Sequence, residues 1–427
     1  MMQEEIFREV ENETSFVSLT ETNNVFPRIR DESFDFKGVP ASLEIYGIHP
    51  YPAMFHFLVV RKLLHSFSSV DAFVMDPFMG SGVVAGECLI SGRNFIGFDI
   101  NPLAVLITKV RTTPISGKLL LNTLESLSLQ YMSVIPDREY FKNIKFWFDE
   151  ETIFSLSKLK KLIFEISDPS VRNFFLVVFS ETVRRVSKTK FNEYKLLRRK
   201  SDFEKPNVLL TFQNVAERNI SRLTSFFNKY SQLQKGKLQF YEMNILDDIP
   251  VKDKSIDLVI TSPPYGDSKT TVPYGQFSRL SLQWLGIDEK VDKFSLGSKL
   301  RDSSFKLPSK YFYQVFQKII TKDEKRAKEV FAFFYDLFLA INVISLKVKP
   351  NGYVCFVVGN RKVKGIEIPT DLISVEFFEL FGLKHHKTIV RAISNKRIPM
   401  ENSPSNIKGA KDSTMKYEYI LILQKLG

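Results

Sequence analysis

The sequence contains few of the residues that mark secreted or metal-binding proteins. Among its 427 residues there are only two cysteines, Cys88 and Cys355, and five histidines. Both cysteines stand in apolar runs, which favours buried thiols in a reducing compartment over a disulfide. No Cys/His spacing resembles a zinc site, and no cluster of carboxylates suggests another metal. We therefore predict neither a disulfide framework nor a metal centre.

The chain also offers no convincing segment for a membrane. Its first residues, MMQEEIFREVENE, are acidic and polar, unlike a signal peptide. The most apolar long stretch, 330–346, is short for a span and carries Asp336 and Asn342. We interpret this stretch as a core helix and expect a cytoplasmic protein without a membrane partner.

Acidic residues are in the minority. The net charge is +12 and the pI is about 9.3, which favours a polyanionic partner, with nucleic acid ahead of a membrane surface. Residues 111–236 hold 22 Lys and Arg against 13 Asp and Glu, so most of the excess lies there. A solvated helical surface could have the same composition. Residues 287–328, with 11 Lys and Arg, are a second basic region.

Strand patterns occur at seven places and are separated mostly by helical patterns. They lie at 70–78, 93–101, 237–244, 255–262, 352–360, 383–390 and 416–424. This order predicts an α/β fold with a doubly wound, mostly parallel seven-stranded sheet. No helix fits between the last two strands, so the final strand can run antiparallel. Residues 111–236 are mostly helical in pattern, and Asp168-Pro169 reads as the start of a helix.

A glycine-rich loop, MDPFMGSGVVAG, connects the first strand to a helix. Glycines at 80, 82 and 86 fit neither the dinucleotide fingerprint nor a P-loop, but they let a ligand approach the backbone. Asp99 ends the second strand, where an acid can hold ribose hydroxyls or simply cap the next helix. Asn244 ends the third strand and could contact a base. These features predict a ligand that carries a nucleoside.

The stretch TSPPYGDS follows a buried strand directly. Proline cannot donate to a sheet ladder, so Ser262, Pro263, Pro264 and Tyr265 form a loop at the ligand-binding edge. A serine hydroxyl and an exposed carbonyl can accept the hydrogens of an exocyclic amine, and Tyr265 offers a flat face to a base. The alternative is a strand-terminating turn with a structural tyrosine.

Together DPFMGSG, FDIN and TSPPY resemble the amino-methylating DNA methyltransferases that use S-adenosylmethionine. Ser-Pro-Pro-Tyr is similar to the form typical of the N4-cytosine branch, whereas the adenine-N6 branch more often has Asp or Asn in place of Ser262. HPYPAMF, YGQFSRLSLQWLG, KPNGYVCFVVGNR and RAISNKRIP also resemble family segments. The resemblance covers roughly 45–110 and 237–400.

The resemblance implies residue roles. The implied contacts to S-adenosylmethionine are Phe55, Asp76, Phe78, Gly80, Ser81, Gly82, Asp99 and Asn244. The implied catalytic residues, which hold a base flipped out of the duplex, are Ser262, Pro263, Pro264 and Tyr265. A DNA enzyme needs a recognition element, and we place it first in the insertion, with Arg184, Arg185, Lys188, Lys190, Lys195, Arg198 and Arg199 on the phosphates.

The implied reaction is direct, in-line methyl transfer to N4 of cytosine in double-stranded DNA, without a covalent enzyme intermediate. Methylation at carbon 5 would need a cysteine on the base-holding loop, which is absent. The implied setting is a bacterial restriction-modification system with a cognate endonuclease. The alternatives are an adenine-N6 methyltransferase and a non-catalytic DNA-binding subunit of the same fold. The implied organisation is an N-terminal arm (1–40), a catalytic domain (41–110 and 237–427) and a helical insertion (111–236).

Overall fold

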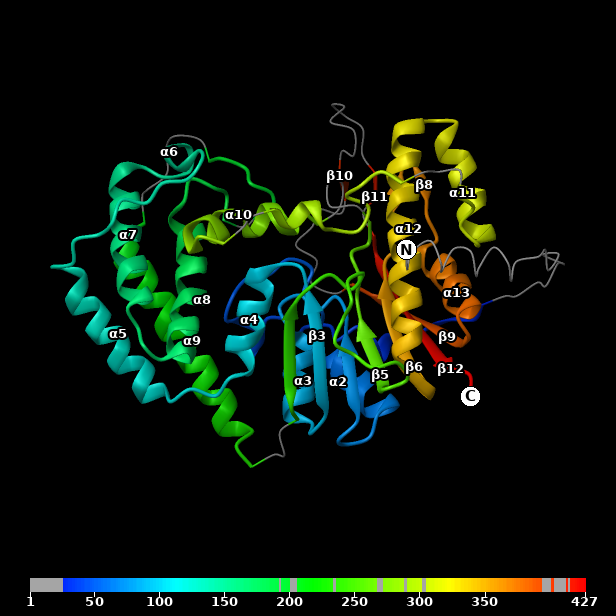
Figure 1. The fold of residues 1–427 in the computed structure, drawn as a ribbon, viewed down its shortest axis with the longest axis horizontal. Coiled ribbons are helices and arrows are strands. Elements are labelled where there is room, and N and C mark those ends of the chain that lie inside the picture. The colour runs from blue at the N-terminus through cyan, green and yellow to red at the C-terminus, as the bar shows by residue number, and fades with distance from the viewer. Residues whose placement is uncertain are drawn as a thin grey trace.

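A computed structural model describes residues 26–191, 193–199, 206–232, 236–266, 272–287, 290–301, 305–393, 401–402, 412–413 and 415–427. Its centre is an eight-stranded sheet in the order β1-β9-β12-β6-β5-β2-β3-β4 (Figure 1). The strands of this sheet are β1 (Arg28–Arg30), β2 (Phe73–Asp76), β3 (Asn94–Asp99), β4 (Leu238–Glu242), β5 (Ile256–Thr261), β6 (Val348–Val358), β9 (Leu383–Ala392) and β12 (Tyr417–Lys425). Two smaller pairs are β7 (Lys362–Val363) with β8 (Ile366–Glu367) and β10 (Glu401–Asn402) with β11 (Asp412–Ser413).

The sheet confirms the predicted fold class. The pairs β2–β3, β2–β5, β3–β4 and β5–β6 are parallel, and β12 runs antiparallel to both β6 and β9. Helices cover both faces. The helices are α2 (Phe57–Phe67), α3 (Val83–Ile90), α4 (Pro102–Thr112), α5 (Gly117–Tyr131), α6 (Ile144–Trp147), α7 (Glu150–Phe164), α8 (Pro169–Val186), α9 (Val208–Lys229), α10 (Tyr274–Leu285), α11 (Lys310–Ile320), α12 (Glu324–Lys347) and α13 (Thr370–Leu380).

Alternate strand residues supply two separate cores. Val74 of β2 and Leu258 of β5 belong to the core that includes α2, α3 and α4, whereas their neighbours Met75 and Val259 belong to the core with α11, α12 and α13. This alternation follows from the two-residue period of a strand. It explains why the strands are apolar on both faces, as in a sheet covered by helices on each side.

The predicted core helix at 330–346 lies within α12. By length and composition α12 could cross a membrane, but most of its apolar window is buried inside the protein. It packs against α11 and α13 in the second core. The apolar composition of α12 is therefore explained by its place in the core.

The sheet has one strand more than the sequence predicts. Residues 28–30, expected to belong to a polar arm, form β1 and pair in parallel with β9. Arg28 reaches across to Asp371 at the start of α13, with Nε 2.8 Å from Oδ2. The sequence RIR is too short to show a strand pattern. Backbone pairing with β9 and the Arg28–Asp371 ion pair hold it in the sheet.

Helices α5–α9 form a bundle beside α4, at the left of Figure 1. Asp168 caps α8 by accepting from the amides of Ser170 and Val171, and Pro169 follows as the first helical residue, as the sequence predicts. Phe175 of α8 and Phe212 of α9 lie in the same core as α2 and α3. Helix α10 joins the bundle to the sheet, and Ser281 donates to the carbonyl of Ser180 at 2.9 Å.

Candidate active site

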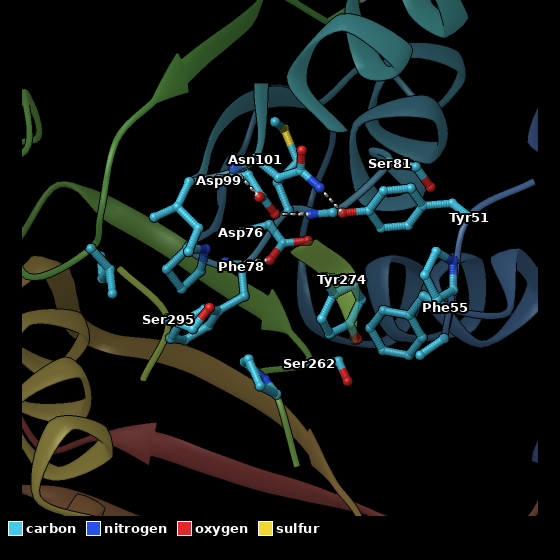
Figure 2. Close-up of a pocket in the computed structure, with 18 of the residues that line it drawn as sticks. Tyr51, Phe55, Asp76, Phe78, Ser81, Asp99, Asn101, Ser262, Tyr274 and Ser295 are labelled. Carbon is cyan, nitrogen blue, oxygen red and sulfur yellow. Dashed lines mark hydrogen bonds between the residues drawn. The ribbon is translucent and has the colours of Figure 1, made fainter. Parts of the chain in front are cut away.

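A cavity that opens to solvent lies at the carboxyl ends of β2, β3 and β5 (Figure 2). In doubly wound sheets this edge is where ligands bind. Most of the predicted cofactor-binding and catalytic residues line this cavity. They are Phe55, Asp76, Phe78, Gly80, Ser81, Asp99, Asn244, Ser262 and Pro264. Phe55 and Pro264, more than 200 positions apart in the chain, are thus brought to one cavity.

Asp76 ends β2 at the floor of the cavity. Its Oδ1 accepts from Thr261 Oγ1 at 2.7 Å and from the amide of Phe78 at 3.1 Å. Burial raises the pKa of this carboxyl to about 7, and the nearby Asp99 adds to the effect. A donor or cation bound at Asp76 would offset this desolvation cost.

Asp99 ends β3 and holds the glycine loop. Its Oδ2 accepts from the amide of Gly80 and its Oδ1 from the amide of Asn101, both at 2.8 Å. Burial raises the pKa of Asp99 to about 6. Asp99 does not cap α4, since Asn101 does so by accepting from the amide of Leu103.

Gly82 supports the loop rather than lining the cavity. It precedes α3 with φ of +77°, and an added Cβ would lie 2.3 Å from Cγ2 of Thr108. Ser81 is held from below by the buried guanidinium of Arg111, which donates to both its carbonyl and its hydroxyl oxygen. The loop is therefore fixed by packing with α4 before any ligand binds.

The polar cavity residues that were not predicted from the sequence include Tyr51, Asn101 and Tyr274. Asn101 donates to Tyr51 Oη at 3.2 Å and to Ser278 Oγ at 2.8 Å, and the rings of Tyr51 and Tyr274 lie 6.0 Å apart. All three stand in segments that resemble the family, HPYPAMF, FDIN and YGQFSRL. Their positions in those segments were the sequence signal from which they could have been predicted.

The remaining wall is apolar. It includes Phe55, Phe78, Phe294 and Leu296. Asn244 is tied to this wall, because its Nδ2 donates to the carbonyl of Phe294 at 3.0 Å and its Oδ1 accepts from the amide of Leu246. Its main visible role is thus to hold the segment that carries Phe294.

The Ser-Pro-Pro-Tyr corner contributes two of its residues to the cavity. Ser262 and Pro264 line it, whereas Pro263 is buried beneath and Tyr265 lies beyond the lining. Ser262 Oγ lies 3.1 Å from Tyr265 Oη, which lies 3.1 Å from Oε1 of Glu418. Tyr265 is buried enough that desolvation raises its pKa well above the usual value.

The cavity suits a nucleoside that carries positive charge. Asp76 and Asp99 are desolvated acceptors for hydroxyls or cations, and the aromatic side chains offer apolar faces for a base. S-Adenosylmethionine has ribose hydroxyls, an adenine ring, an ammonium group and a sulfonium, so the residues present fit it. Within the described ranges, no group of three or more His, Cys, Asp and Glu could hold a metal ion.

The basic segment, residues 188–199 without the undescribed residue 192, folds back on itself. Thr189 and Arg198 form an isolated antiparallel bridge, and Tyr194 packs against Phe277 of α10 with ring centroids 6.1 Å apart. Lys190, Lys195 and Arg198 are exposed. Lys188 and Arg199 are half-buried, and Arg199 Nε donates to the carbonyl of Thr189 at 2.6 Å.

The prediction that Arg184 contacts phosphate is wrong for this structure. Its side chain is 0% exposed and lies over the ring of Phe277 at 4.0 Å, where Nη1 donates to the Phe277 carbonyl at 2.8 Å. Arg185, its neighbour on α8, is paired with Glu181 at 2.7 Å but remains partly exposed. Arg184 therefore joins α8 to α10 and is not available to DNA.

Comparisons with known proteins identify the family of this chain. A family model described as DNA methylase, covering the N6 and N4 enzymes, matches residues 8–110. The Type II methyltransferase M.MvaI of Kocuria varians is 38% identical over 411 residues, which cover 88% of this chain and 90% of the relative. The Type II methyltransferase M.MjaII of Methanocaldococcus jannaschii is 32% identical over 115 residues, 27% of this chain and 20% of the relative.

Among solved structures, an S-adenosylmethionine-dependent methyltransferase from Methanosarcina mazei covers 88% of this chain and 99% of its own, with 10% identity and a TM-score of 0.32. The rRNA methyltransferase aviRa from Streptomyces viridochromogenes covers 92% and 94%, with 10% identity and a TM-score of 0.30. The sequence relationship to M.MvaI, which spans most of both chains, decides the assignment. The chain belongs to the amino DNA methyltransferases, enzymes that use S-adenosylmethionine to methylate an exocyclic amine of a DNA base.

Proposed function

We propose that this enzyme methylates N4 of a cytosine that has been flipped out of duplex DNA. The observation that carries this proposal is the shared cavity: Ser262 and Pro264, at the end of β5, line the same space as Asp76 and Asp99. The base-holding corner and the proposed cofactor residues thus face one another across a single site. A serine rather than an acid or amide at position 262 favours the cytosine branch.

Each set of residues has a proposed role. Asp99 accepts from the ribose hydroxyls, Asp76 offsets positive charge, and Phe55 and Phe78 with the Gly80–Ser81 turn enclose the rest of the cofactor. Bound S-adenosylmethionine supplies an electrophilic methyl group. Ser262 Oγ and a carbonyl of the Pro-Pro pair accept the hydrogens of the base amine, which draws its lone pair out of conjugation with the ring. Tyr265 supplies an aromatic ring beside the base.

The proposed DNA surface is the basic segment, with Arg185 beside it. Its exposed cations Lys190, Lys195 and Arg198 lie on a segment that packs on α10, and α10 begins at Tyr274 in the cavity wall. A duplex bound along this segment would therefore lie near the cavity mouth. The second basic region, 287–328, borders the same cavity through Phe294 and Leu296 and is the rival surface.

We further propose that the enzyme is the modification half of a restriction-modification system. The support is its likeness to M.MvaI, which is described as a Type II methyltransferase. A cognate endonuclease that cuts the same site would be its partner in the bacterial cytoplasm.

Nucleoside mass spectrometry tests the proposed reaction directly. Purified enzyme is incubated with unmethylated genomic DNA and S-adenosylmethionine, and the DNA is then digested to nucleosides. N4-Methylcytosine is the expected product. N6-Methyladenine would overturn the base assignment, and the absence of any methylated base would favour a non-catalytic subunit. The Ser262→Asp variant then shows whether this position selects the base.

A further inference from the structure

Ser262 stands at one end of a chain of hydrogen bonds that leads away from the cavity to strands β12 and β9. Ser262 Oγ contacts Tyr265 Oη at 3.1 Å, and Tyr265 Oη contacts Glu418 Oε1 at 3.1 Å. The other oxygen of Glu418 accepts from Arg391 Nη1 at 2.8 Å. Glu418 and Arg391 are direct partners on the neighbouring strands β12 and β9.

The last members of this chain are firmly held. Arg391 is 4% exposed, and its Nε donates to the carbonyl of Phe34 at 3.0 Å. Tyr265 lies close against Gly359, where an added Cβ would be 2.8 Å from Cδ2 of the tyrosine. The tyrosine hydroxyl is therefore delivered to Glu418 by packing, and Glu418 is held by an arginine that cannot lose its charge.

The ion pair sets the direction of every hydrogen bond in the chain. An ionised carboxylate only accepts, so Tyr265 must donate its single proton to Glu418. The oxygen of Tyr265 is then left as an acceptor, and Ser262 donates to it. The Ser262 hydroxyl has thereby used its only hydrogen, and its free lone pair faces the cavity that it lines.

We propose that Glu418 is a positioning residue, which fixes the Ser262 hydroxyl as a hydrogen-bond acceptor toward the substrate amine. This inference rests on the proposed function, in which the base presents an exocyclic NH₂ to Ser262. A hydroxyl turned the other way would point its hydrogen at an amine hydrogen and repel the base. The chain thus makes the site prefer an amine over a carbonyl at that position of the base.

The Glu418→Gln variant tests this directly because it keeps the size of the side chain. Arg391 will hold the amide oxygen, so the amide NH₂ faces Tyr265 and donates to it. Tyr265 then donates to Ser262, and the Ser262 hydrogen points into the cavity. We expect single-turnover methylation to fall by about 10- to 100-fold, the usual effect of a mismatched buried donor. Affinity for S-adenosylmethionine is expected to stay within about two-fold, because that residue set is separate.

A binding measurement separates orientation from mere loosening of the fold. Duplexes carry either cytosine or uracil at the site that the wild-type enzyme methylates, and S-adenosylhomocysteine replaces the cofactor. Wild type is expected to prefer the amine of cytosine, whereas Glu418→Gln is expected to lose or invert that preference, since its Ser262 hydroxyl can donate to the uracil carbonyl. If adenine is the wild-type target, adenine and hypoxanthine replace this pair.

Two comparisons complete the test. In a Tyr265→Phe background the chain is already broken, so adding Glu418→Gln should change the rate by less than about two-fold. Glu44→Gln, which removes another ion-paired glutamate, outside the cavity and bonded to Lys229, is the matched control and should behave as wild type. Unchanged turnover in Glu418→Gln, or an equal loss in both backgrounds, would overturn the positioning role. Failure of the wild type to methylate any base would overturn the proposed function and this inference with it.

Discussion

The carboxylates at the two ends of the cavity differ in their partners. At the cofactor end, Asp76 is buried and Asp99 is half-buried, and both accept only from hydroxyl and amide donors, with no basic partner among the described residues. At the base end, Glu418 is neutralised by Arg391 within the protein. In the first arrangement the negative charge has no basic partner among the described residues, so a cationic ligand can pair with it. In the second arrangement the charge of Glu418 is paired with Arg391, and only the direction of the hydrogen bonds acts on the substrate.

The sharpest test of this contrast is Asp99→Asn. Replacing the carboxylate that we propose accepts from the ribose hydroxyls should weaken S-adenosylmethionine binding by about 100-fold, because charged hydrogen bonds are the stronger kind. Isothermal titration calorimetry measures the affinity, and a thermal melt checks that the Gly80 loop is still folded. Asp248→Asn, an exposed substitution outside the cavity lining, is the control. A matching loss of DNA affinity in Asp99→Asn would show that the two ends are not separate.

The opposite end is tested by Tyr265→Ala. Loss of the ring and of the hydroxyl that orients Ser262 should slow methylation by about 30-fold while cofactor affinity stays unchanged, since base stacking is worth about 1–3 kcal/mol. Single-turnover kinetics and calorimetry on the same preparation give the two values. Equal losses in rate and cofactor affinity would remove Tyr265 from the base-holding role.

Proton uptake distinguishes the two ends as well. The pKa values of Asp76 and Asp99 are raised to about 7 and about 6, so both are partly protonated in the free enzyme below neutrality. We expect cofactor affinity to weaken by about ten-fold as the pH is lowered from about 8 to about 6, because binding a cation requires the ionised forms. Calorimetry across this pH range measures the cofactor affinity. An affinity that is flat with pH would mean that the carboxyls do not charge-pair with the cofactor.

The raised pKa values also predict how the stability of the enzyme changes with pH. Because the folded-state pKa of Asp76 lies above its unfolded value, the native protein binds more protons than the unfolded chain between about pH 4 and 7. The stability of the ligand-free enzyme should therefore decline as pH rises through this window, and Asp76→Asn should reduce the decline. Chemical denaturation at a series of pH values measures the slope, and an unchanged slope in the variant would assign it to other groups.

Much of the sheet and of the cofactor end could be predicted from local sequence. The apolar runs at β2, β3 and β5 end in loops at one edge, and topology then brings Asp76, Asp99 and Ser262 together. The contribution of Tyr274 could not be predicted this way, because it depends on how α10 returns across the cavity mouth. The role of Glu418 could not be predicted either, since it depends on cross-strand pairing with Arg391.

Charge patterns were the least reliable guide. Arg184 and Arg185 are adjacent in a cation-rich run, yet one is fully buried against Phe277 and the other is partly exposed beside Glu181. A helix turns by 100° per residue, so neighbours in sequence can face the core and the solvent. Composition identifies a basic region, but the helical phase decides which of its cations can reach DNA.

That distinction gives the last and smallest expected effect. Replacing Lys190, Lys195 and Arg198 by Gln should lower DNA affinity by less than ten-fold at moderate salt, and should reduce the slope of log affinity against log salt by about 3 if each cation contacts one phosphate. The matched control replaces the exposed Lys299, Lys306 and Lys310 of the second basic region. Fluorescence anisotropy over a salt series measures both sets. A slope that changes only in the second set would move the DNA interface away from the insertion and onto the segment that borders Phe294, which would place both the cofactor wall and the DNA contacts on residues 287–328.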